Sequence, residues 1–547
     1  MHRLDSRAAA IAFSLALVVL LVIYGPAARA TAAPPDQGLY VLTPVAHDVG
    51  PSLEHARQSD HAGERTREQP LLRPNASGGA PGKPGKGGAA DGSVQSAASV
   101  PLGSIGARSF DGVGVGITPT YTDCCAPPDT NASVGLTQVV QWVNLDIAVF
   151  DKVTGALAAG YPKPGNSIWS GFTAGNCDKN NDGDPIVKFD AQAGKWFVTQ
   201  FSVTGGAPYF ECIAVSQTSD FAATAWNRYA YNFGTSFPDY PKAGVWPDAY
   251  YMSFNMFLNG VSFTGATACA FDRTLMLSGG AATGQCRNLG TGVASLLPSD
   301  LDGATGATGT SSLPPPNSPS FFMNFGTNAL NLWKFHVDFA NSANSTFTGP
   351  TSLAVPAFST ACGGGTCIPQ AGTSNQLDSL GDRLMYRLAY RNFAGSERLV
   401  VTHSVKGSGT AAPRWYELTS PGTGTFAVTQ ASSYAPDATY RWMSSAAMDK
   451  VGNIAMGYSA SSTAISPAIR ITGRAPGDPG STLRIEETII NGTGSQTGTL
   501  HRWGDYSSMA VDPSDDCTFW YTTEYLKTSG TFNWSTRIAS FKLPGCN

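Results

Sequence analysis

The sequence predicts an all-β fold, a single β-propeller that follows a disordered N-terminal spacer. The 547 residues include 61 glycines and 36 prolines but only 14% charged residues, and long runs rich in Ala, Leu, Glu and Lys are missing. Long helices are therefore not expected. The abundant Ser, Thr, Gly and aromatic residues fit short strands joined by turns. In addition, one strand–turn–strand pattern recurs along the chain.

The clearest copy of this pattern is residues 502–522, with an acidic turn at 512–516 between two apolar strands. Related patterns start near residues 137, 184, 246, 320, 382 and 441. Their spacing exceeds the 40–50 residues or so of a typical blade, which implies inserted loops. Seven blades are favoured, and six or eight remain open. A pair of β-sandwiches is the alternative, but it would not explain the recurrent Gly/Pro-Asp strand openings.

The N-terminus has the features of an export signal. Arg3 and Arg7 precede a mostly apolar run at 8–24, and Ala28-Arg29-Ala30 is a small-x-small cleavage site. We expect residues 1–30 to be a signal peptide, with an uncleaved signal anchor as the alternative. No later segment of the sequence is apolar enough to span a bilayer. The protein is thus expected to be secreted, periplasmic or displayed at the cell surface.

Residues 31–109 are rich in Pro, Gly, Ala and Ser. Such a composition buries too little apolar surface to offset the entropy lost on ordering. We expect a disordered spacer or propeptide here, followed by the propeller at 110–547.

All ten cysteines lie beyond the signal, and an even number in an exported chain suggests disulfides. Cys124 and Cys125 would form a vicinal bridge or pair elsewhere. The remaining cysteines have close sequence partners, which favours the pairs Cys177–Cys212, Cys269–Cys286, Cys362–Cys367 and Cys517–Cys546.

Charge and motifs narrow the possible functions. The net charge of −4 offers no basic face for nucleic acid. The sequence has no HExxH, GxSxG or Walker-type motif. These absences argue against a zinc protease, an α/β-hydrolase and a nucleotide-dependent enzyme.

In the loop at residues 178–184, side chains with oxygen atoms stand at alternating positions, as they do in a calcium-binding loop. Gly183 permits the sharp turn at the sixth position, but Phe189 stands where an EF-hand has its bidentate Glu. We therefore expect a single-loop structural Ca²⁺ site, with an ordinary polar turn as the alternative. The candidate ligands are Asp178, Asn180, Asp182 and Asp184.

Acidic residues also stand at predicted strand openings. Innermost strands of a propeller converge on its channel, so these carboxylates could gather there for acid/base chemistry or cation binding. The alternative is that each one satisfies neighbouring backbone N–H groups. The residues are Asp184, Asp248, Asp382 and Asp505. As candidate catalytic residues we name Asp248, Asp505 and Tyr506.

Arginines form the third candidate group. Arg383, Arg387 and Arg391 are spaced by four, which keeps them on one face of a strand or of a short helix. Arg441 and Arg502 precede a Trp in the last two repeats. Guanidinium clusters suit carboxylates and sulfates, and ion pairing between blades is the alternative. The substrate-binding candidates are Arg387, Arg441, Arg502 and Trp503. Most of the tryptophans, such as Trp169, Trp246 and Trp442, are expected in the core rather than under a sugar.

The turn at 514–520 resembles the Asp-box of sialidase-like propellers. Residues 110–546 also resemble a family of exported bacterial proteins of unassigned activity. Segments 129–131, 183–187, 240–242, 246–248, 382–387 and 502–506 carry this likeness. The sialidase likeness implies that Arg387, Arg441 and Arg502 surround a substrate carboxylate, with Tyr525 beside Glu524 as the nucleophile pair.

The sequence therefore favours an exported β-propeller that binds extracellular glycans at its channel face, with acidic sugars preferred. A complete catalytic set cannot be named, so binding is favoured over hydrolysis. A sialidase-like glycoside hydrolase and a cell-surface adhesion or structural module are the alternatives.

Overall fold

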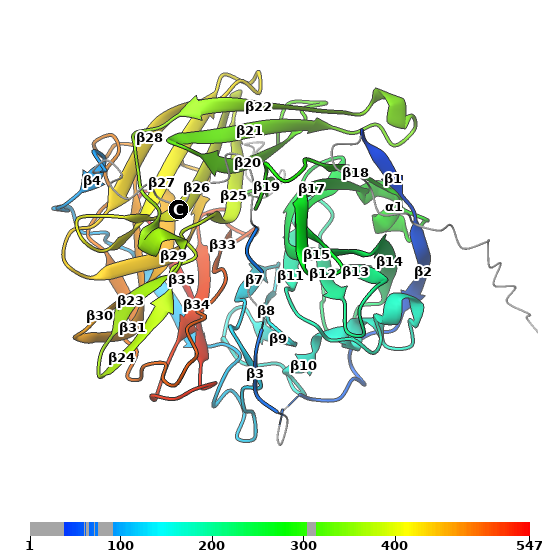
Figure 1. Cartoon of the computed structure of the whole chain (residues 1–547), viewed down its shortest axis with the longest axis horizontal. Coiled ribbons are helices and arrows are strands. Elements are labelled where there is room, and N and C mark those ends of the chain that lie inside the picture. Colours follow the sequence, from blue (N-terminus) through cyan, green and yellow to red (C-terminus); the bar gives the residue numbers. More distant parts are fainter. Residues whose placement is uncertain (1–37, 60, 62–64, 70–71, 75–90, 304–312) are drawn as a thin grey trace, which may run out of the picture.

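The protein is a ring of mostly antiparallel sheets whose innermost strands surround a common centre (Figure 1). The computed structural model describes residues 38–59, 61, 65–69, 72–74, 91–303 and 313–547. The prediction of an all-β propeller is confirmed. The predicted signal peptide at 1–30 lies outside the described residues. No helix in the described part of the chain is long and apolar enough to cross a membrane.

The first three blades run from residue 131 to residue 288. Blade one contains β7 (Asn131–Val134), β8 (Gln138–Val143), β9 (Asp146–Asp151) and β10 (Lys163–Pro164). Blade two contains β11 (Ile186–Asp190), β12 (Lys195–Ser202), β13 (Tyr209–Ser216) and β14 (Trp226–Gly234). Blade three contains β15 (Ser236–Val245), β16 (Ala249–Leu258), β17 (Ser262–Asp272) and β18 (Gly284–Asn288).

The next two blades form one nine-stranded sheet with strand β4. Blade four contains β19 (Leu297–Leu301), β20 (Ser320–Gly326), β21 (Ala329–His336) and β22 (Thr346–Ala354). Blade five contains β25 (Leu384–Phe393), β26 (Ser396–Lys406), β27 (Ala411–Ser420) and β28 (Ala427–Tyr434). The two halves meet at their innermost strands, since β19 pairs with β25 in parallel.

The ring ends with two further sheets. Blade six contains β29 (Tyr440–Met448), β30 (Ile454–Ser462), β31 (Ile465–Arg474) and β32 (Glu487–Ile490). Blade seven contains β33 (Ser508–Val511), β34 (Phe519–Tyr525), β35 (Ser535–Lys542) and β5 (Ile105–Asp111). The smaller elements are α1 (Arg273–Ser278), η1 (Gly165–Trp169), η2 (Ala174–Asn176), η3 (Ser342–Asn344), η4 (Ala361–Gly364) and the hairpin β23 (Thr366–Gln370) and β24 (Thr373–Asp378).

The innermost strands form a closed circle. In order they are β7, β11, β15, β19, β25, β29 and β33; each contacts the next, and β33 returns to β7. Dividing the nine-stranded sheet at its parallel pair thus gives seven blade units within the described residues. The repeats assigned near 137, 246 and 320 start one strand late. Residue 137 follows β7, residues 246–248 form the turn from β15 to β16, and β20 follows β19.

Each blade packs both of its faces against the neighbouring blades. Strands inside a blade are therefore buried on both sides and consist largely of apolar residues. In β8 five of six residues are buried, instead of every second residue. Large aromatic side chains fill the spaces between blades, and each contributes roughly 1.5–3 kcal/mol on burial. Trp169, Trp246 and Trp442, which were expected in the core, are at most 1% exposed, and so is the substrate-binding candidate Trp503. Trp503 is therefore not a stacking surface; its Nε1 donates to Ser459 Oγ at 3.0 Å.

The N-terminal segment belongs to the ring, which corrects part of the predicted spacer at 31–109. Its strands β1 (Tyr40–Leu42) and β2 (Pro44–Gly50) lie along the outer edges of blades three and two, at the right of Figure 1. On the opposite side, β4 (Val94–Gln95) pairs with β28, and β5 completes blade seven. A strand that adds to an existing edge needs little apolar surface of its own, so composition does not reveal it.

The four predicted disulfides are all formed: Cys177–Cys212, Cys269–Cys286, Cys362–Cys367 and Cys517–Cys546. Among the described residues, Cys124 and Cys125 are the two cysteines outside a disulfide, and both are buried. Four disulfides fit an extracellular protein.

Two ion pairs fasten the N-terminal segment and provide a test of its role. Asp91 pairs with Arg414 at 2.8 Å, and both side chains are at most 1% exposed. Removing Asp91 would leave a buried cation, so Asp91→Ala should lower the free energy of unfolding by about 3–5 kcal/mol. Urea denaturation measures this change.

Lys527→Ala is the control. Lys527 pairs with Asp111 of β5 at 2.9 Å, and both side chains are 35% exposed. An ion pair this exposed should contribute only about 0–1 kcal/mol. Equal effects of the two substitutions would contradict the structural role of the Asp91 pair.

Candidate functional site

An unusual backbone conformation recurs where each blade begins its innermost strand. One residue per blade has a positive φ between 42° and 56° there, before the strand or at a bulge within it. Residues other than glycine adopt this conformation infrequently, with Asn and Asp the commonest exceptions. The seven residues are Asp129, Asp184, Tyr240, Ser295, Leu380, Met443 and Asp505. The three aspartates belong to blades one, two and seven, whose innermost strands are neighbours.

Four carboxylates share one electrostatic environment at this end of the channel. Asp129 forms a side-chain hydrogen bond with Asp184, and both lie close enough to Asp505 for its charge to raise their pKa values. Asp239 of β15 is influenced by Asp184 and Asp505 in the same way. Asp129 and Asp505 are 1% and 6% exposed, while Asp184 and Asp239 keep more contact with solvent. Solvent therefore reaches the edge of the cluster.

Burial is the main cause of the raised pKa values. It raises the pKa of Asp129 and of Asp239 well above the ordinary range, and repulsion by the neighbouring carboxylates adds to this. The pKa of Asp184 is also raised by burial, although Lys242 and Arg502 oppose the shift. Such a cluster holds protons at a pH where isolated carboxylates have lost them.

Three cations surround the carboxylates. Lys242 is fully buried, and its Nζ lies 3.5 Å and 4.0 Å from the ring centres of Tyr240 and Tyr506. Burial lowers the pKa of Lys242 to about 8. Arg502 pairs with Asp505, and Arg383 lies 4.5 Å from the Tyr240 ring while its Nε donates to Asp382 at 2.9 Å.

Three buried tyrosine rings pack next to this cluster. Tyr240, Tyr386 and Tyr506 come from different blades, and the Tyr506 ring lies between the others, with its centroid 6.1 Å from that of Tyr240 and 6.3 Å from that of Tyr386. All three are at most 4% exposed. The predicted residue Tyr506 thus lies at the site, where its hydroxyl donates to the Pro185 carbonyl at 3.3 Å. The rings form a wall of the site rather than its solvent-exposed surface.

The structure does not bring the three predicted arginines together. Arg387 is fully engaged with Asp300 and Asp302, and Arg441 with Asp437 and Glu486. Both guanidinium groups are buried, Arg387 among the innermost strands and Arg441 against Glu486, so ion pairing between elements explains them better than a ligand does. Of the three, only Arg502 lies at the channel entrance.

The remaining predicted catalytic residues have other surroundings. Asp248 occupies the turn between β15 and β16, where the Tyr251 hydroxyl donates to it at 3.2 Å. Because β15 runs away from the entrance cluster, this turn is at the opposite end of the strand. The Tyr525 hydroxyl donates to Asp111 of β5. Glu524 accepts the N–H of Gly504, and the charge of Asp505 adds to the burial that raises the pKa of Glu524, so this carboxyl group borders the entrance cluster. Tyr525 and Glu524 thus have separate partners.

The predicted calcium loop is held by its own hydrogen bonds. Asp182 accepts N–H groups of Val203 and Thr204 at 2.6 Å and 2.8 Å, and Asn180 donates to Ser202 Oγ at 2.8 Å. Asp184 belongs to the entrance cluster, as described above. Within the part of the chain that the structure describes, no group of three or more His, Cys, Asp or Glu residues is arranged to hold a metal ion. Asp178 Oδ1 is among the described buried oxygens without a hydrogen-bond partner, and the single-loop Ca²⁺ site stays a prediction.

Sequence reasoning missed part of the site. Asp129 and Asp239 follow a proline directly before or within an innermost strand, which is the same Gly/Pro-Asp signal that marked Asp184. Lys242 and Tyr386 carry no such signal, because their importance depends on contacts between blades.

Comparisons with known proteins yield weak structural likenesses. Neither the protein-family models nor the curated protein sequences give a match to this chain. The WD40 domain of SCAP from fission yeast is 8% identical, with 74% of this chain and 82% of that chain covered and a TM-score of 0.32. Endo-1,5-α-L-arabinanase from Thermotoga petrophila is 10% identical, with 76% and 98% covered and a TM-score of 0.28. Likenesses this weak assign neither a family nor an activity to the chain.

The protonation of Asp248 provides a test of stability. Burial raises its pKa from 3.8 to about 6. Because the folded pKa exceeds the unfolded one, the contribution to stability is complete below about pH 4 and is lost as the pH rises through about 6. Asp248→Asn should remove this loss, which is about 3 kcal/mol or less. Urea denaturation of both proteins across this range measures the difference; parallel pH profiles would contradict it.

Chelation tests the calcium loop. Since Asp182 and Asn180 are used in hydrogen bonds, we expect EDTA to leave the melting midpoint unchanged within about 1 °C. Differential scanning calorimetry before and after dialysis against chelator gives the answer. A lower midpoint that added Ca²⁺ restores would show that the loop rearranges around an ion.

Proposed function

We propose that the protein binds and hydrolyses extracellular carbohydrate at the entrance of its central channel. The observation that carries this proposal is the placement of Asp129, Asp184 and Asp505. Three neighbouring blades each have an aspartate at the same left-handed backbone position. The charges of Asp184 and Asp505 raise the pKa of Asp129, and the charge of Asp505 raises that of Asp184. Glycoside hydrolysis needs such a pair of carboxyl groups in different protonation states.

The environments support different roles for the carboxyl groups. Asp129 is the most deeply buried, and its raised pKa suits a general acid that gives its proton to the leaving oxygen as the glycosidic C–O bond breaks. Asp505, paired with Arg502, suits the ionised group that accepts a proton from the attacking water or bonds to the sugar carbon. Asp184, hydrogen-bonded to Asp129, would position the acid and maintain its pKa.

The balance of charge favours uncharged sugars over the acidic sugars expected from the sequence. Lys242, Arg383 and Arg502 each lie beside carboxylates, so none is left as a free anion receptor. An added uronic or sialic acid carboxylate would meet four aspartates. We therefore propose a neutral glycan as substrate. The four disulfides and the predicted export signal support an extracellular substrate.

Asparagine variants test the proposal. Asp129→Asn and Asp505→Asn keep the shape of the side chain but cannot transfer a proton, so each should lower the rate of hydrolysis by about 10²–10⁴-fold. The assay is release of reducing ends from a panel of neutral and acidic polysaccharides, together with aryl glycosides.

Asp248→Asn is the matched control, because Asp248 lies outside the entrance cluster. Its rate should equal that of the wild type. If the wild-type protein cleaves none of these glycans but binds one of them, and Asp129→Asn binds equally, the site is not catalytic. Absence of both cleavage and binding would instead leave a structural or adhesive module.

A further inference from the structure

A cavity of about 260 Å³ lies between blades five and six. Blade five contributes side chains of β26, β27 and β28 to its lining, and blade six contributes residues of β30 and β31 with the turns next to them. One water molecule needs about 10–15 Å³, and pockets for small molecules begin at roughly 300 Å³. The cavity is therefore large enough for several waters or for one small ligand.

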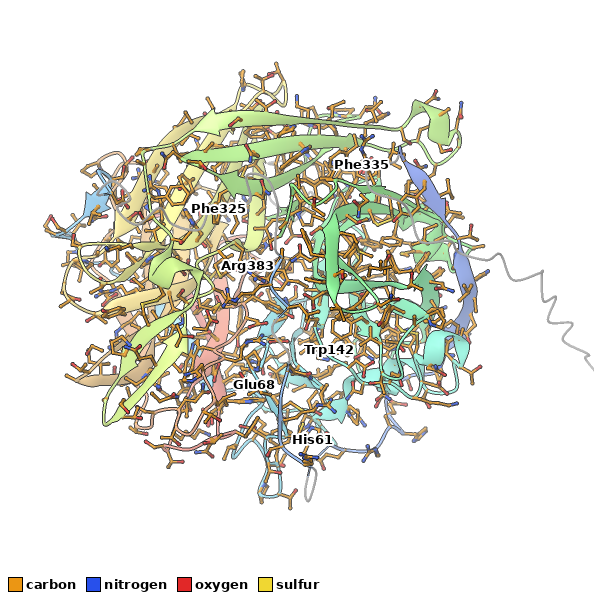
Figure 2. The ribbon with its side chains drawn as sticks, viewed as in Figure 1. His61, Glu68, Trp142, Phe325, Phe335 and Arg383 are labelled. Atoms are coloured by element: carbon orange, nitrogen blue, oxygen red, sulfur yellow. A yellow bond between two sulfur atoms is a disulfide. The ribbon has the colours of Figure 1, made fainter. Side chains whose placement is uncertain are left out.

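This cavity is separate from the entrance cluster. Arg398 of β26, which lines it, stands opposite Arg391 near the end of β25. The entrance residue Arg383 directly precedes the start of the same strand, and Figure 2 shows it in the middle part of the ring. The cavity thus lies toward the other end of the strands.

Arg474 of β31 brings a positive charge without an ion pair to the cavity. It is only 4% exposed, and its Nη1 donates to the carbonyls of Pro479 and Thr482 at 2.9 Å and 3.2 Å. Asp478 is engaged elsewhere, because Arg484 donates to both of its carboxylate oxygens at 2.8 Å and 2.9 Å. Burial lowers the pKa of Arg474, as expected for a cation that lacks a direct counter-charge.

Arg398 is the second cation of the lining. Its Nη1 donates to Glu417 Oε1 at 3.0 Å, whereas its buried Nε has no hydrogen-bond acceptor in the part of the chain that the structure describes. Its guanidinium lies 4.6 Å from the ring centre of Phe393, a contact that fixes its position. Two arginines and one glutamate line the cavity, so its charged groups sum to +1.

The rest of the lining is mostly polar. Thr419, Thr429 and Gln430 contribute hydroxyl and amide groups, and Ile454 and Pro476 provide the apolar part. Hydroxyl groups both donate and accept hydrogen bonds, as the hydroxyl groups of a sugar do. Guanidinium groups bind carboxylates through paired N–H donors. The matching ligand is small, polar and singly negative.

We propose that this cavity binds a sugar acid. Its carboxylate would contact Arg398 and Arg474, and its hydroxyl groups would contact Glu417 and the two threonines. This site is distinct from the entrance carboxylates that we propose to hydrolyse neutral glycans, and it requires no catalysis. It would give the protein a second point of attachment, specific for acidic carbohydrate.

Titration of the purified protein with galacturonate, followed by ligand-observed NMR, tests the site. Galactose is the neutral counterpart, and acetate is a carboxylate without hydroxyl groups. We expect galacturonate to bind with a Kd in the millimolar range or below, and the other two probes to bind at least about tenfold more weakly. Equal affinity for galactose or acetate would overturn the assignment to sugar acids, and absence of galacturonate binding would overturn the site.

Arg398→Gln locates the binding. It removes a charged donor and should weaken galacturonate binding by about tenfold or more. Arg537→Gln is the matched control, because Arg537 also pairs with one carboxylate, at 2.7 Å, and is 21% exposed against 29% for Arg398. The control should bind like the wild type. Unchanged binding in Arg398→Gln would overturn the proposal.

Glu417→Gln distinguishes charge from damage to the fold. It retains an oxygen that can accept from Arg398 but removes the negative charge, so galacturonate should bind about threefold more tightly or better. A substitution that merely disturbed the cavity would weaken binding instead, and that result would overturn the electrostatic basis of the site. Galacturonate binding that follows these variants, in a protein that cleaves no glycan, would support this site while the proposed hydrolase activity fails.

Discussion

The closed circle of innermost strands depends on hydrogen bonds between blades. In each, a side-chain oxygen of one blade accepts a backbone N–H group at the inner edge of a neighbouring blade. The N–H of Val187 donates to Asn131 Oδ1 at 2.8 Å, and that of Met509 donates to Ser445 Oγ at 3.1 Å. Carboxylates do the same elsewhere, since Asp302 accepts the N–H of Met448 at 2.7 Å. A buried N–H without a partner is costly, so these contacts fix how each blade is placed relative to the next.

The buried arginines of β25 follow from this arrangement. Asp300 and Asp302 accept backbone N–H groups of β15 and β29, and Arg387 neutralises both carboxylates. Arg391 similarly binds Asp516 of the turn after β33. Burial of charge requires such pairing. The inner part of the channel is thus filled by structural ion pairs, and the chemically unusual groups remain at the strand entrances.

The sequence predicts local features of this fold well and distant ones poorly. Cys269 and Cys286 are close in sequence and lie opposite each other on β17 and β18, so their pairing is readable. The spacing of Arg383, Arg387 and Arg391 fits a strand or a short helix, and the structure has a strand, with Arg387 and Arg391 on β25 and Arg383 directly before it. It does not reveal that the partners of Arg387 are more than 80 residues away. Likewise, β1 and β2 join blades whose strands begin more than 130 residues later, and their composition gives no sign of it.

The entrance aspartates illustrate how a structural role can be separated from a functional one. Asp tolerates a left-handed backbone better than most residues, so it could have been placed there for its conformation alone. However, Tyr240, Ser295, Leu380 and Met443 adopt the same conformation in the other blades. The backbone therefore does not require a carboxylate. Burial and mutual repulsion both disfavour the ionised carboxylates in these three adjacent blades, so their presence requires another explanation. Strained backbone together with clustered charge is typical of functional sites.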